Sequence, residues 1–449
     1  MDLYIRGAAI LRLLAAKNGS LKALATSSPN SKRMYALLCQ SLKYQDVLKQ
    51  VICSSRLLEQ EQRLSLEIAL LLVHDLLLCK NGIAAGKGPF KDAVLRHKTR
   101  LKAEFARAKI RSRTVESKDL ERKNHKVLPR WVRINTLKTT LHSALETCRN
   151  DYTEVENWSQ LSPSSFCIDA LIPNLLAFHS SCNLITHNLY TVGHIILQDK
   201  ASCFPVHILN PPLGACVIDA CAAPGNKTSY LAACVGKQGR VYAFERDNQR
   251  VQTLSTMMEK SGADCVHIQH LNFLKSNPCN FANVTHMLLD PSCSGSGIVN
   301  RLDYLVESQQ QIDQDRLAKL AEFQVQIILH AMKFPSAKKI SYSTCSIHPQ
   351  ENEHVVMRVL DKIQDWTLAN QQDVLPSWET RGIAEECGGD KGLLLHFGIP
   401  LMIDLAHSLV RCNPGADGTI GFFAALFVRK SSNKRTLQDP PTSKKKKRK

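Results

Sequence analysis

The chain has 449 residues, of which 44% are hydrophobic and 22% charged, so it is long enough to bury an extensive core without disulfide staples. Lys and Arg outnumber Asp and Glu by 58 to 40, and this excess favours a polyanionic partner, although it also aids solubility. The sixteen cysteines are irregularly spaced and none forms a C-x-x-C pair. This pattern argues against structural zinc and indicates a reducing, intracellular compartment.

Residues 1 to about 85 show helical periodicity. The strongly apolar stretch from Leu66 to Cys79 is too short to span a bilayer and predicts a buried core helix. Residues 91–113 predict one helix with nine Lys or Arg and two acids, whose apolar residues Val94, Leu95, Leu101, Phe105 and Ile110 form a stripe. Such a helix could lie on nucleic-acid phosphates or present a solvated face. The amphipathic, acid-poor N-terminus lacks a signal-peptide layout but leaves a mitochondrial address open.

A polar linker at residues 114–126 is followed by a strand-like block, Leu128 to Lys138, which opens a small α+β module. Beyond it, strand candidates alternate with helices and predict a parallel sheet covered on both faces. These strands are expected at 216–220, 240–245, 266–271, 286–290 and 339–343, and a further strand is expected at 421–428. The chain therefore divides into an N-terminal helical domain at 1–115, an α+β module at 127–205, a Rossmann-like α/β domain at 206–430 and a disordered basic tail at 431–449.

A strand running into a tight turn and a helix, Val217 to Thr228, predicts a nucleotide-type site. Its small residues allow close backbone approach, and a helix N-terminus presents free N–H groups. Glu245 ends the next predicted strand, where an acid can accept hydrogen bonds from ribose hydroxyls, or it is merely a solvated strand end. The dinucleotide pattern G-x-G-x-x-G is absent, so the pattern favours a different nucleoside-containing cofactor.

The turn Asp219–Thr228 resembles the S-adenosylmethionine motif of the Nop/Sun family of RNA cytosine-5 methyltransferases. Three more stretches resemble that family in the same order: Arg133–Lys138, Asp290–Gly297, and Tyr342–Ser346 with the following Glu351–Glu353. The large-subunit ribosomal RNA branch is the most similar. The resemblance implies S-adenosyl-L-methionine as cofactor, held by Cys221, Ala222, Ala223, Pro224, Gly225, Asn226, Lys227, Glu245, Arg250, Asn272 and Asp290. Relatives usually carry Asp at the positions of Glu245 and Asn272, which implies altered cofactor affinity.

Methylation at C5 of cytosine requires a nucleophile that adds at C6 and places electron density on C5. A thiolate suits this role because it is soft and partly ionised near neutral pH. The resemblance assigns attack to Cys345 and enzyme release to Cys293, which the residues alone do not rank. Asp290 would relieve charge at N3, and Lys227 would stabilise the thiolate or the cytosine carbonyl, unless it is a surface lysine.

The target base must be unstacked before a thiol can reach it. Arg130, Trp131, Arg133 and Lys138 offer a positive face with an aromatic for RNA, although Trp131 could equally be a core residue. The Lys-Arg tail predicts a nuclear or nucleolar address. Large-subunit ribosomal RNA is the expected substrate, and the alternatives are transfer or other RNA, DNA cytosine-5 methylation, and a catalytically silent ribosome-assembly factor.

Overall fold

The computed structural model describes residues 1–16, 21–26, 30–112, 128–298, 314–388 and 402–430. One compact unit contains residues 1–127, and a second begins at Leu128. The predicted basic tail lies outside the described residues. None of the helices described in these ranges is long and apolar enough to cross a membrane.

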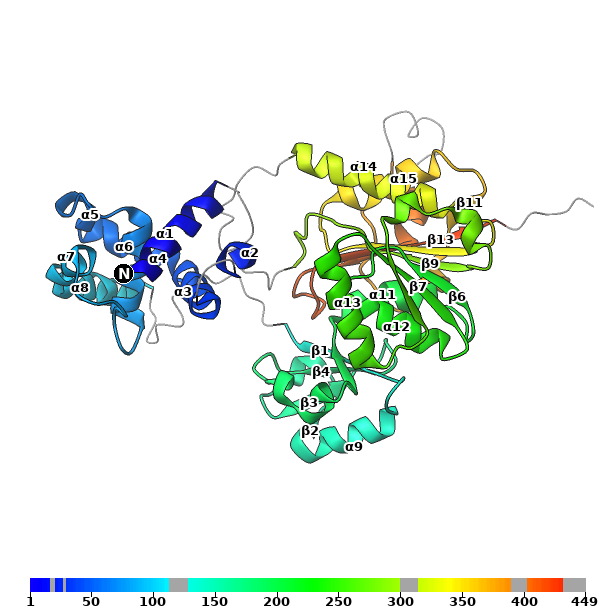
Figure 1. Ribbon diagram of the computed structural model, residues 1–449, viewed down its shortest axis with the longest axis horizontal. Coiled ribbons are helices and arrows are strands. Elements are labelled where there is room, and N and C mark those ends of the chain that lie inside the picture. The colour runs from blue at the N-terminus through cyan, green and yellow to red at the C-terminus, as the bar shows by residue number, and fades with distance from the viewer. Residues whose placement is uncertain (17–20, 27–29, 113–127, 299–313, 389–401, 431–449) are drawn as a thin grey trace, which may run out of the picture. The chain divides into compact units, whose positions relative to one another are not determined.

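The first unit is helical, as predicted (Figure 1). Helix α6 (Leu66–Leu78) packs against several of the others, and its residues from Ile68 to Asp75 are all buried. This confirms the expected core helix. The remaining helices are α1 (Asp2–Ala15), α2 (Leu21–Thr26), α3 (Ser31–Lys43), α4 (Gln45–Ser54), α5 (Leu57–Gln60), α7 (Pro89–Arg96) and α8 (Lys98–Arg111).

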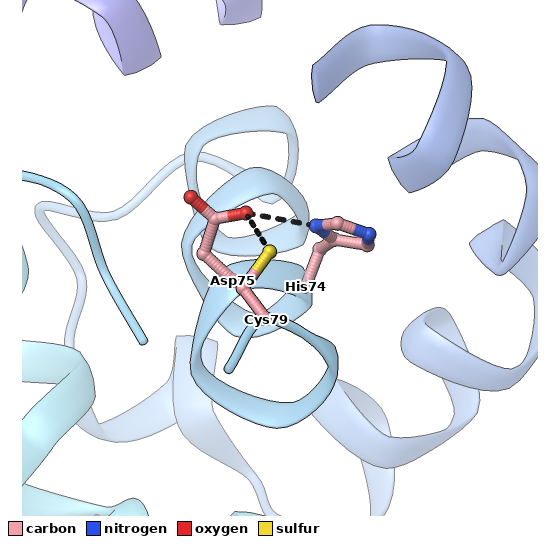
Figure 2. A group of neighbouring side chains, drawn as sticks. All are labelled: His74, Asp75 and Cys79. Carbon is pink, nitrogen blue, oxygen red and sulfur yellow. Dashed lines mark hydrogen bonds and ion pairs between the residues drawn. The ribbon is translucent and has the colours of Figure 1, made fainter. Parts of the chain in front are cut away.

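The polar residues buried in α6 form a hydrogen-bonded cluster with α1. Figure 2 shows Asp75 Oδ1 accepting from His74 Nδ1 at 2.9 Å and from Cys79 Sγ at 3.2 Å. The other carboxylate oxygen accepts from the Tyr4 hydroxyl, which in turn accepts from the Ala84 backbone N–H at 2.9 Å. Because each group in the chain of bonds has a partner, the cluster offsets the cost of burying a carboxylate and ties α1 to α6.

Replacing Asp75 by alanine is expected to lower the free energy of unfolding by about 1–3 kcal/mol, because Tyr4 and His74 lose their acceptor. Burial alone would raise the pKa of Asp75, but hydrogen bonds from His74, Tyr4 and Cys79 outweigh it and lower the pKa. The stabilisation is therefore present above the ordinary carboxyl range and is lost as pH falls through the lowered pKa. Urea denaturation at pH 7 and pH 3 measures it, with the exposed Asp92→Ala as control.

The basic segment at 91–113 is not one helix, as the sequence predicted, but two. Helix α7 ends at Arg96 and α8 begins at Lys98, with His97 between them at φ −98°, ψ 8°. Both Arg96 and His97 bind Glu61, at 2.7 and 3.2 Å, and these contacts fix the break. The predicted apolar stripe is only partly buried, because Leu95 and Ile110 are exposed.

The second unit opens with a five-stranded sheet, which confirms the predicted α+β module. Strand β1 (Arg130–Ile134) lies between β4 (Leu175–Phe178) and β5 (Ile195–Leu197) and is antiparallel to both. Strands β3 (Ser165–Ile168) and β2 (Thr153–Glu154) continue the sheet beyond β4. Residues of α9 (Leu141–Asp151) share a core with one face of the sheet.

An eight-stranded sheet forms the larger part of this unit, in the order β11-β13-β10-β9-β6-β7-β8, with β12 paired to β13. Strands β6 to β10 are parallel, and β13 is antiparallel to its neighbours. Their bounds are β6 Cys216–Asp219, β7 Arg240–Glu245, β8 Val266–His270, β9 His286–Leu289, β10 Lys339–Thr344, β11 Trp366–Leu368, β12 Leu409–Cys412 and β13 Phe422–Arg429. The predicted Rossmann-like α/β class is confirmed, with each predicted strand within one residue of its observed ends.

Helices cover both faces of this sheet (Figure 1). Residues of α11 (Lys200–Leu209), α12 (Asn226–Val235) and α13 (Asn248–Ser261) contribute to one apolar core. Those of α14 (Gln314–Ala331) and α15 (Glu353–Leu360) contribute to another. Because β6, β7, β9 and β10 run in one direction, their carboxyl ends meet at one rim, where ligands bind in folds of this kind.

Candidate functional site

Two cysteines meet at the rim of the large sheet. Cys293 follows β9 and Cys345 follows β10, its parallel neighbour, and the two sulfur atoms lie 3.1 Å apart. The hydrogen bond to Cys345, together with burial, raises the pKa of Cys293. Either sulfur could donate the hydrogen bond that joins them. Both thiols are therefore candidate nucleophiles at this rim.

Backbone contacts fix the two cysteine-bearing loops against each other. The Gly297 N–H donates to the Cys345 carbonyl at 2.9 Å, and the Gly421 N–H donates to the Gly297 carbonyl at 2.7 Å. A Cβ at Gly297 would lie 2.1 Å from the Gly421 oxygen, so only glycine fits. Ser294 and Ser346 add a hydroxyl–hydroxyl bond at 3.1 Å. These contacts hold together the two loop backbones that carry the thiols.

The stretch Glu351–Glu353 forms hydrogen bonds that support these loops, a role that the sequence did not reveal. Glu351 accepts from the Ser294 backbone N–H at 2.9 Å, and Asn352 binds Thr344, the residue before Cys345, at 2.6 Å. Glu353 forms a buried bidentate pair with Arg411, with both distances 2.6 Å. The sequence shows the two acids on either side of Asn352, but it does not show which residues they bind.

An ion pair between Lys227 and Asp290 lies beside the thiols. Lys227 Nζ and Asp290 Oδ2 are 2.7 Å apart, and the Ser343 hydroxyl donates to the other carboxylate oxygen at 2.7 Å. Burial alone would lower the pKa of Lys227, but the charges of Asp290 and Cys345 outweigh it and raise the pKa. Lys227 is thus a half-buried cation that favours negative charge on Cys345, and not a surface helix lysine.

The predicted cofactor turn connects β6 to α12. Asp219 is buried at the end of β6, where its carboxylate accepts from the Thr228 hydroxyl at 2.8 Å. The Ala223–Pro224 peptide is cis, and Gly225 has φ +113°, a conformation that favours glycine. A Cβ at Gly225 would also lie 2.9 Å from Met258 of α13. The turn residues Cys221 to Lys227 therefore lie where the sequence placed them, between β6 and the first turn of α12.

Asp219 gives this turn a pH-dependent stability. Burial raises the pKa of Asp219 to about 7, so its contribution to stability is present below the ordinary pKa near 4 and is lost as pH rises through about 7. Asp219→Asn is expected to gain stability relative to the unsubstituted protein between pH 4 and 7, by up to roughly 4 kcal/mol. Urea denaturation at several pH values measures this difference. The exposed Asp264→Asn serves as control and should show no such trend.

The other predicted cofactor residues gather at the same rim. Glu245 ends β7 buried, and one of its carboxylate oxygens accepts from two backbone N–H groups while the other lies 3.2 Å from Arg250. Arg250 also donates to the Ala223 carbonyl at 2.6 Å, which links Glu245 to the turn. Asn272 follows β8 and accepts from the Leu274 N–H at 3.1 Å. A fixed carboxylate, an amide and a turn with small residues fit a nucleoside with ribose hydroxyls.

Two of the residues predicted to contact RNA are buried, and that expectation is corrected. Trp131 is 3% exposed and donates from Nε1 to the Gly418 carbonyl at 2.7 Å. Arg133 is 1% exposed and donates to Gln198 at 2.9 Å and to Ser229 of α12 at 2.7 Å. Trp131 thus links the small sheet to the segment before β13, and Arg133 links it to α12. Trp131 is therefore a core residue, the second of the two interpretations that the sequence allowed.

Arg130 and Lys138 remain accessible candidates for RNA contact. Arg130 is half-buried and donates to the Ser180 carbonyl at 3.0 Å, and the exposed Lys138 donates to the Val192 carbonyl at 3.1 Å. Asn135 was not singled out, yet its buried amide donates to the carbonyls of Gly193 and Ser261, each at 2.8 Å. The stretch Arg133–Asn135 therefore anchors the module to α12 and α13.

Comparison with known proteins agrees with this architecture. Residues 206–428 match the profile of the 16S rRNA methyltransferase RsmB/F family. Residues 32–120 and 128–198 match the N-terminal and ferredoxin-like domains of NOL1/NOP2/Sun domain family member 5.

Two curated relatives match almost the whole chain. A 25S rRNA (cytosine-C(5))-methyltransferase of Schizosaccharomyces pombe is 44% identical, over 98% of this chain and 94% of the relative. A 28S rRNA (cytosine-C(5))-methyltransferase of Mus musculus is 39% identical, over 96% and 91%. A crystal structure of a methyltransferase homologue from Pyrococcus horikoshii shares the fold, with a TM-score of 0.52 and 21% identity over 84% of this chain and 99% of that one.

Proposed function

Because the chain belongs to the NOL1/NOP2/Sun family of rRNA cytosine-5 methyltransferases, we propose that it forms 5-methylcytosine in large-subunit ribosomal RNA with Cys345 as its covalent nucleophile. The observation that supports Cys345 as the nucleophile is that this sulfur, 3.1 Å from Cys293, is the member of the pair whose charge acts on Lys227. Lys227, held by Asp290, adds positive charge near this sulfur. These features activate Cys345 for attack on an electron-poor ring.

The first step is addition of the Cys345 sulfur to C6 of the target cytosine. A C–S bond forms, the ring loses its aromaticity, and negative charge spreads toward N3 while C5 becomes nucleophilic. Asp290 relieves this charge by passing to N3 a proton that it takes from the ammonium group of Lys227, its ion-pair partner, and Ser343 holds the carboxyl group in place.

S-adenosyl-L-methionine, the proposed cofactor, supplies an electrophilic methyl group on a sulfonium. The residues proposed to hold it are Cys221 to Lys227, Glu245, Arg250, Asn272 and Asp290. Glu245 is fixed by two backbone N–H groups and by Arg250, so its carboxylate is preorganised to accept hydrogen bonds from a ribose. The fixed carboxylate beside the turn supports this set, even though relatives usually carry Asp at position 245.

For release, the C5 proton passes to solvent, the electrons of the C5–H bond restore the C5–C6 double bond, and the C6–S bond breaks. As that bond breaks, the electron pair returns to the Cys345 sulfur. The Cys293 thiol lies 3.1 Å away and can donate a hydrogen bond to the departing sulfur. The family resemblance assigns this role to Cys293, and the 3.1 Å distance is compatible with it.

The proposed substrate is tested by bisulfite sequencing of total RNA from cells with and without the protein. One cytosine of large-subunit ribosomal RNA is expected to lose its protection when the protein is absent, and to regain it with the unsubstituted chain but not with Cys345→Ala. Loss of protection only in transfer RNA would move the substrate to that class. Unchanged protection in every RNA would favour a silent assembly factor.

The nucleolus is the proposed location. It is the site where large-subunit RNA is made in eukaryotes, and the sequence from Lys444 to Lys449 is entirely basic. A fluorescent fusion is expected to concentrate in nucleoli and to spread when these six residues are replaced by glutamine. A mitochondrial pattern would contradict the assignment.

A further inference from the structure

Helix α8 carries a distribution of charge that the proposed mechanism does not use. An α-helix turns by about 100° per residue, so the side chains of Lys98–Arg111 fall into four rows around its axis. One row is buried and packs toward α4 and α6. It consists of Leu101, Glu104, Phe105 and Ala108. The other three rows face away from this core.

Two basic rows flank the buried one on opposite sides. The lysine row is Lys98, Lys102 and Lys109, and the arginine row is Arg100, Arg107 and Arg111. All six are exposed except Lys109, which is half-buried and lies over the Phe105 ring at 5.4 Å. The helix has one acid, Glu104, which is buried and paired with Arg107 at 2.6 Å. The two rows are therefore strongly positive and about 180° apart.

Between these rows, opposite the core, runs a crest of small or uncharged residues. It consists of Thr99, Ala103, Ala106 and Ile110, all exposed. Ile110 is 77% exposed, which is costly for an apolar side chain that stays in water. The crest has almost no groups that could read bases by hydrogen bonding, but it lets another surface approach the helix axis closely.

We infer that α8 binds base-paired RNA by lying along a groove, with the lysine row on one phosphate backbone and the arginine row on the other. Each row extends about 16 Å, and the helix is roughly 10–12 Å across, so its two flanks can face two separate backbones. A single strand has one backbone and would engage one row. The bare crest matches recognition by shape and phosphates rather than by base sequence, which is how duplex RNA is usually bound.

This inference rests on the proposed function, because it takes RNA as the substrate, but it assigns a separate surface. The full-length chain would hold a helical segment of the RNA through α8 while the thiols act on an unpaired cytosine. Binding through α8 is expected to be insensitive to sequence and steeply dependent on salt.

The test compares three triple variants of the full-length chain. The first replaces Lys98, Lys102 and Lys109 by glutamine, and the second replaces Arg100, Arg107 and Arg111. A matched control removes the same charge from exposed or partly exposed positions on α3 and α4, by Lys32→Gln, Arg33→Gln and Lys49→Gln. Fluorescence anisotropy measures binding to an RNA hairpin with about 20 base pairs, across a range of salt concentrations.

Each triple variant of α8 is expected to reduce the magnitude of the slope of log affinity against log salt concentration by about 2–3. The reason is that each phosphate contact contributes roughly 0.9 to that slope in a duplex. The control triple should leave the slope nearly unchanged. If only one of the two rows mattered, or if single-stranded RNA showed the same changes, the two-backbone geometry would be wrong. Equal slopes for all three variants would overturn RNA binding by α8, whether or not the helix then binds an acidic protein.

The crest provides an independent, charge-free test. Ala103→Gln with Ala106→Gln should weaken duplex binding by holding the backbones away, whereas Ala103→Ser with Ala106→Ser should not. Covalent trapping of a short single-stranded 5-azacytosine RNA is measured on every variant. If the α8 variants trap RNA normally and bind the duplex as the unsubstituted protein does, only the inference about α8 is wrong. If the unsubstituted enzyme traps no RNA, the proposed function is wrong.

Discussion

A Cys345→Ala enzyme is expected to form no covalent complex with 5-azacytosine RNA and to lose methyl transfer by roughly 10⁴–10⁶-fold, as when other covalent enzymes lose their nucleophile. The reason is that this variant removes the sulfur that lies 3.1 Å from Cys293 and whose charge acts on Lys227. Denaturing electrophoresis of the RNA complex and transfer of labelled methyl groups measure the two effects. Cys345→Ser retaining full turnover would refute covalent catalysis by this residue.

The matching variant, Cys293→Ala, should behave in the opposite way. Because Cys345 is retained, addition to C6 still occurs, but the departing sulfur has lost its hydrogen-bond donor. The adduct is therefore expected to accumulate even on ordinary cytosine RNA, with little net turnover. Cys279→Ala, which removes an exposed thiol elsewhere, serves as the control and should trap and release RNA normally. If Cys293→Ala abolished trapping while Cys345→Ala preserved it, the two roles would have to be exchanged.

An Asp290→Asn enzyme is expected to lose about 10²–10⁴-fold in kcat, since an amide cannot share an acidic proton with N3. Asparagine keeps the size of the side chain and can still accept from the Ser343 hydroxyl, so the fold of the rim is retained. Single-turnover methyl transfer with saturating RNA isolates this step from binding. Ser343→Ala, which removes only the support of the carboxyl group, should show a smaller loss.

Lys227→Met separates charge from packing at the same site. The methionine fills similar volume but leaves Asp290 without its cation, so trapping of 5-azacytosine RNA should slow and its pH dependence should shift toward alkaline values. Measuring the trapping rate from pH 6 to 9 in Lys227→Met, in Asp290→Asn and in the double variant tests the coupling. Effects that simply multiply would show that the 2.7 Å ion pair does not act as a unit.

The sequence predicted six of the eight strands of the large sheet because their signals are local, whereas the short strands β11 and β12 were not predicted. Each buried strand is a short apolar run, and the motifs stand directly at strand ends, as Asp290 after β9 and Cys345 after β10 show. The carboxyl ends of parallel strands share one rim, so the meeting of these motifs was predictable. The distance between the two sulfurs was not, because it depends on Gly297 and Gly421, which are far apart in the chain.

Where the predictions from sequence were wrong, the residue that determines the structure lies far away in the chain. The break at His97 is fixed by Glu61, and a helical pattern read over a short window contains no sign of it. Arg133 looked like a phosphate ligand because a strand of mixed basic and apolar residues is typical of RNA-binding surfaces. Its real partners, Gln198 and Ser229, come from β5's end and from α12, so its burial follows from tertiary packing alone.

The burial of Arg133 also has a consequence for how a substrate must be presented. The guanidinium fastens the small sheet to the first turn of α12, which directly follows the cofactor turn. If RNA contacts Arg130 or Lys138, as the sequence predicts, this link sets the distance between that contact and the two sulfur atoms. The fold sets this distance, so the target nucleotide has to rotate out of its strand to reach the sulfur atoms.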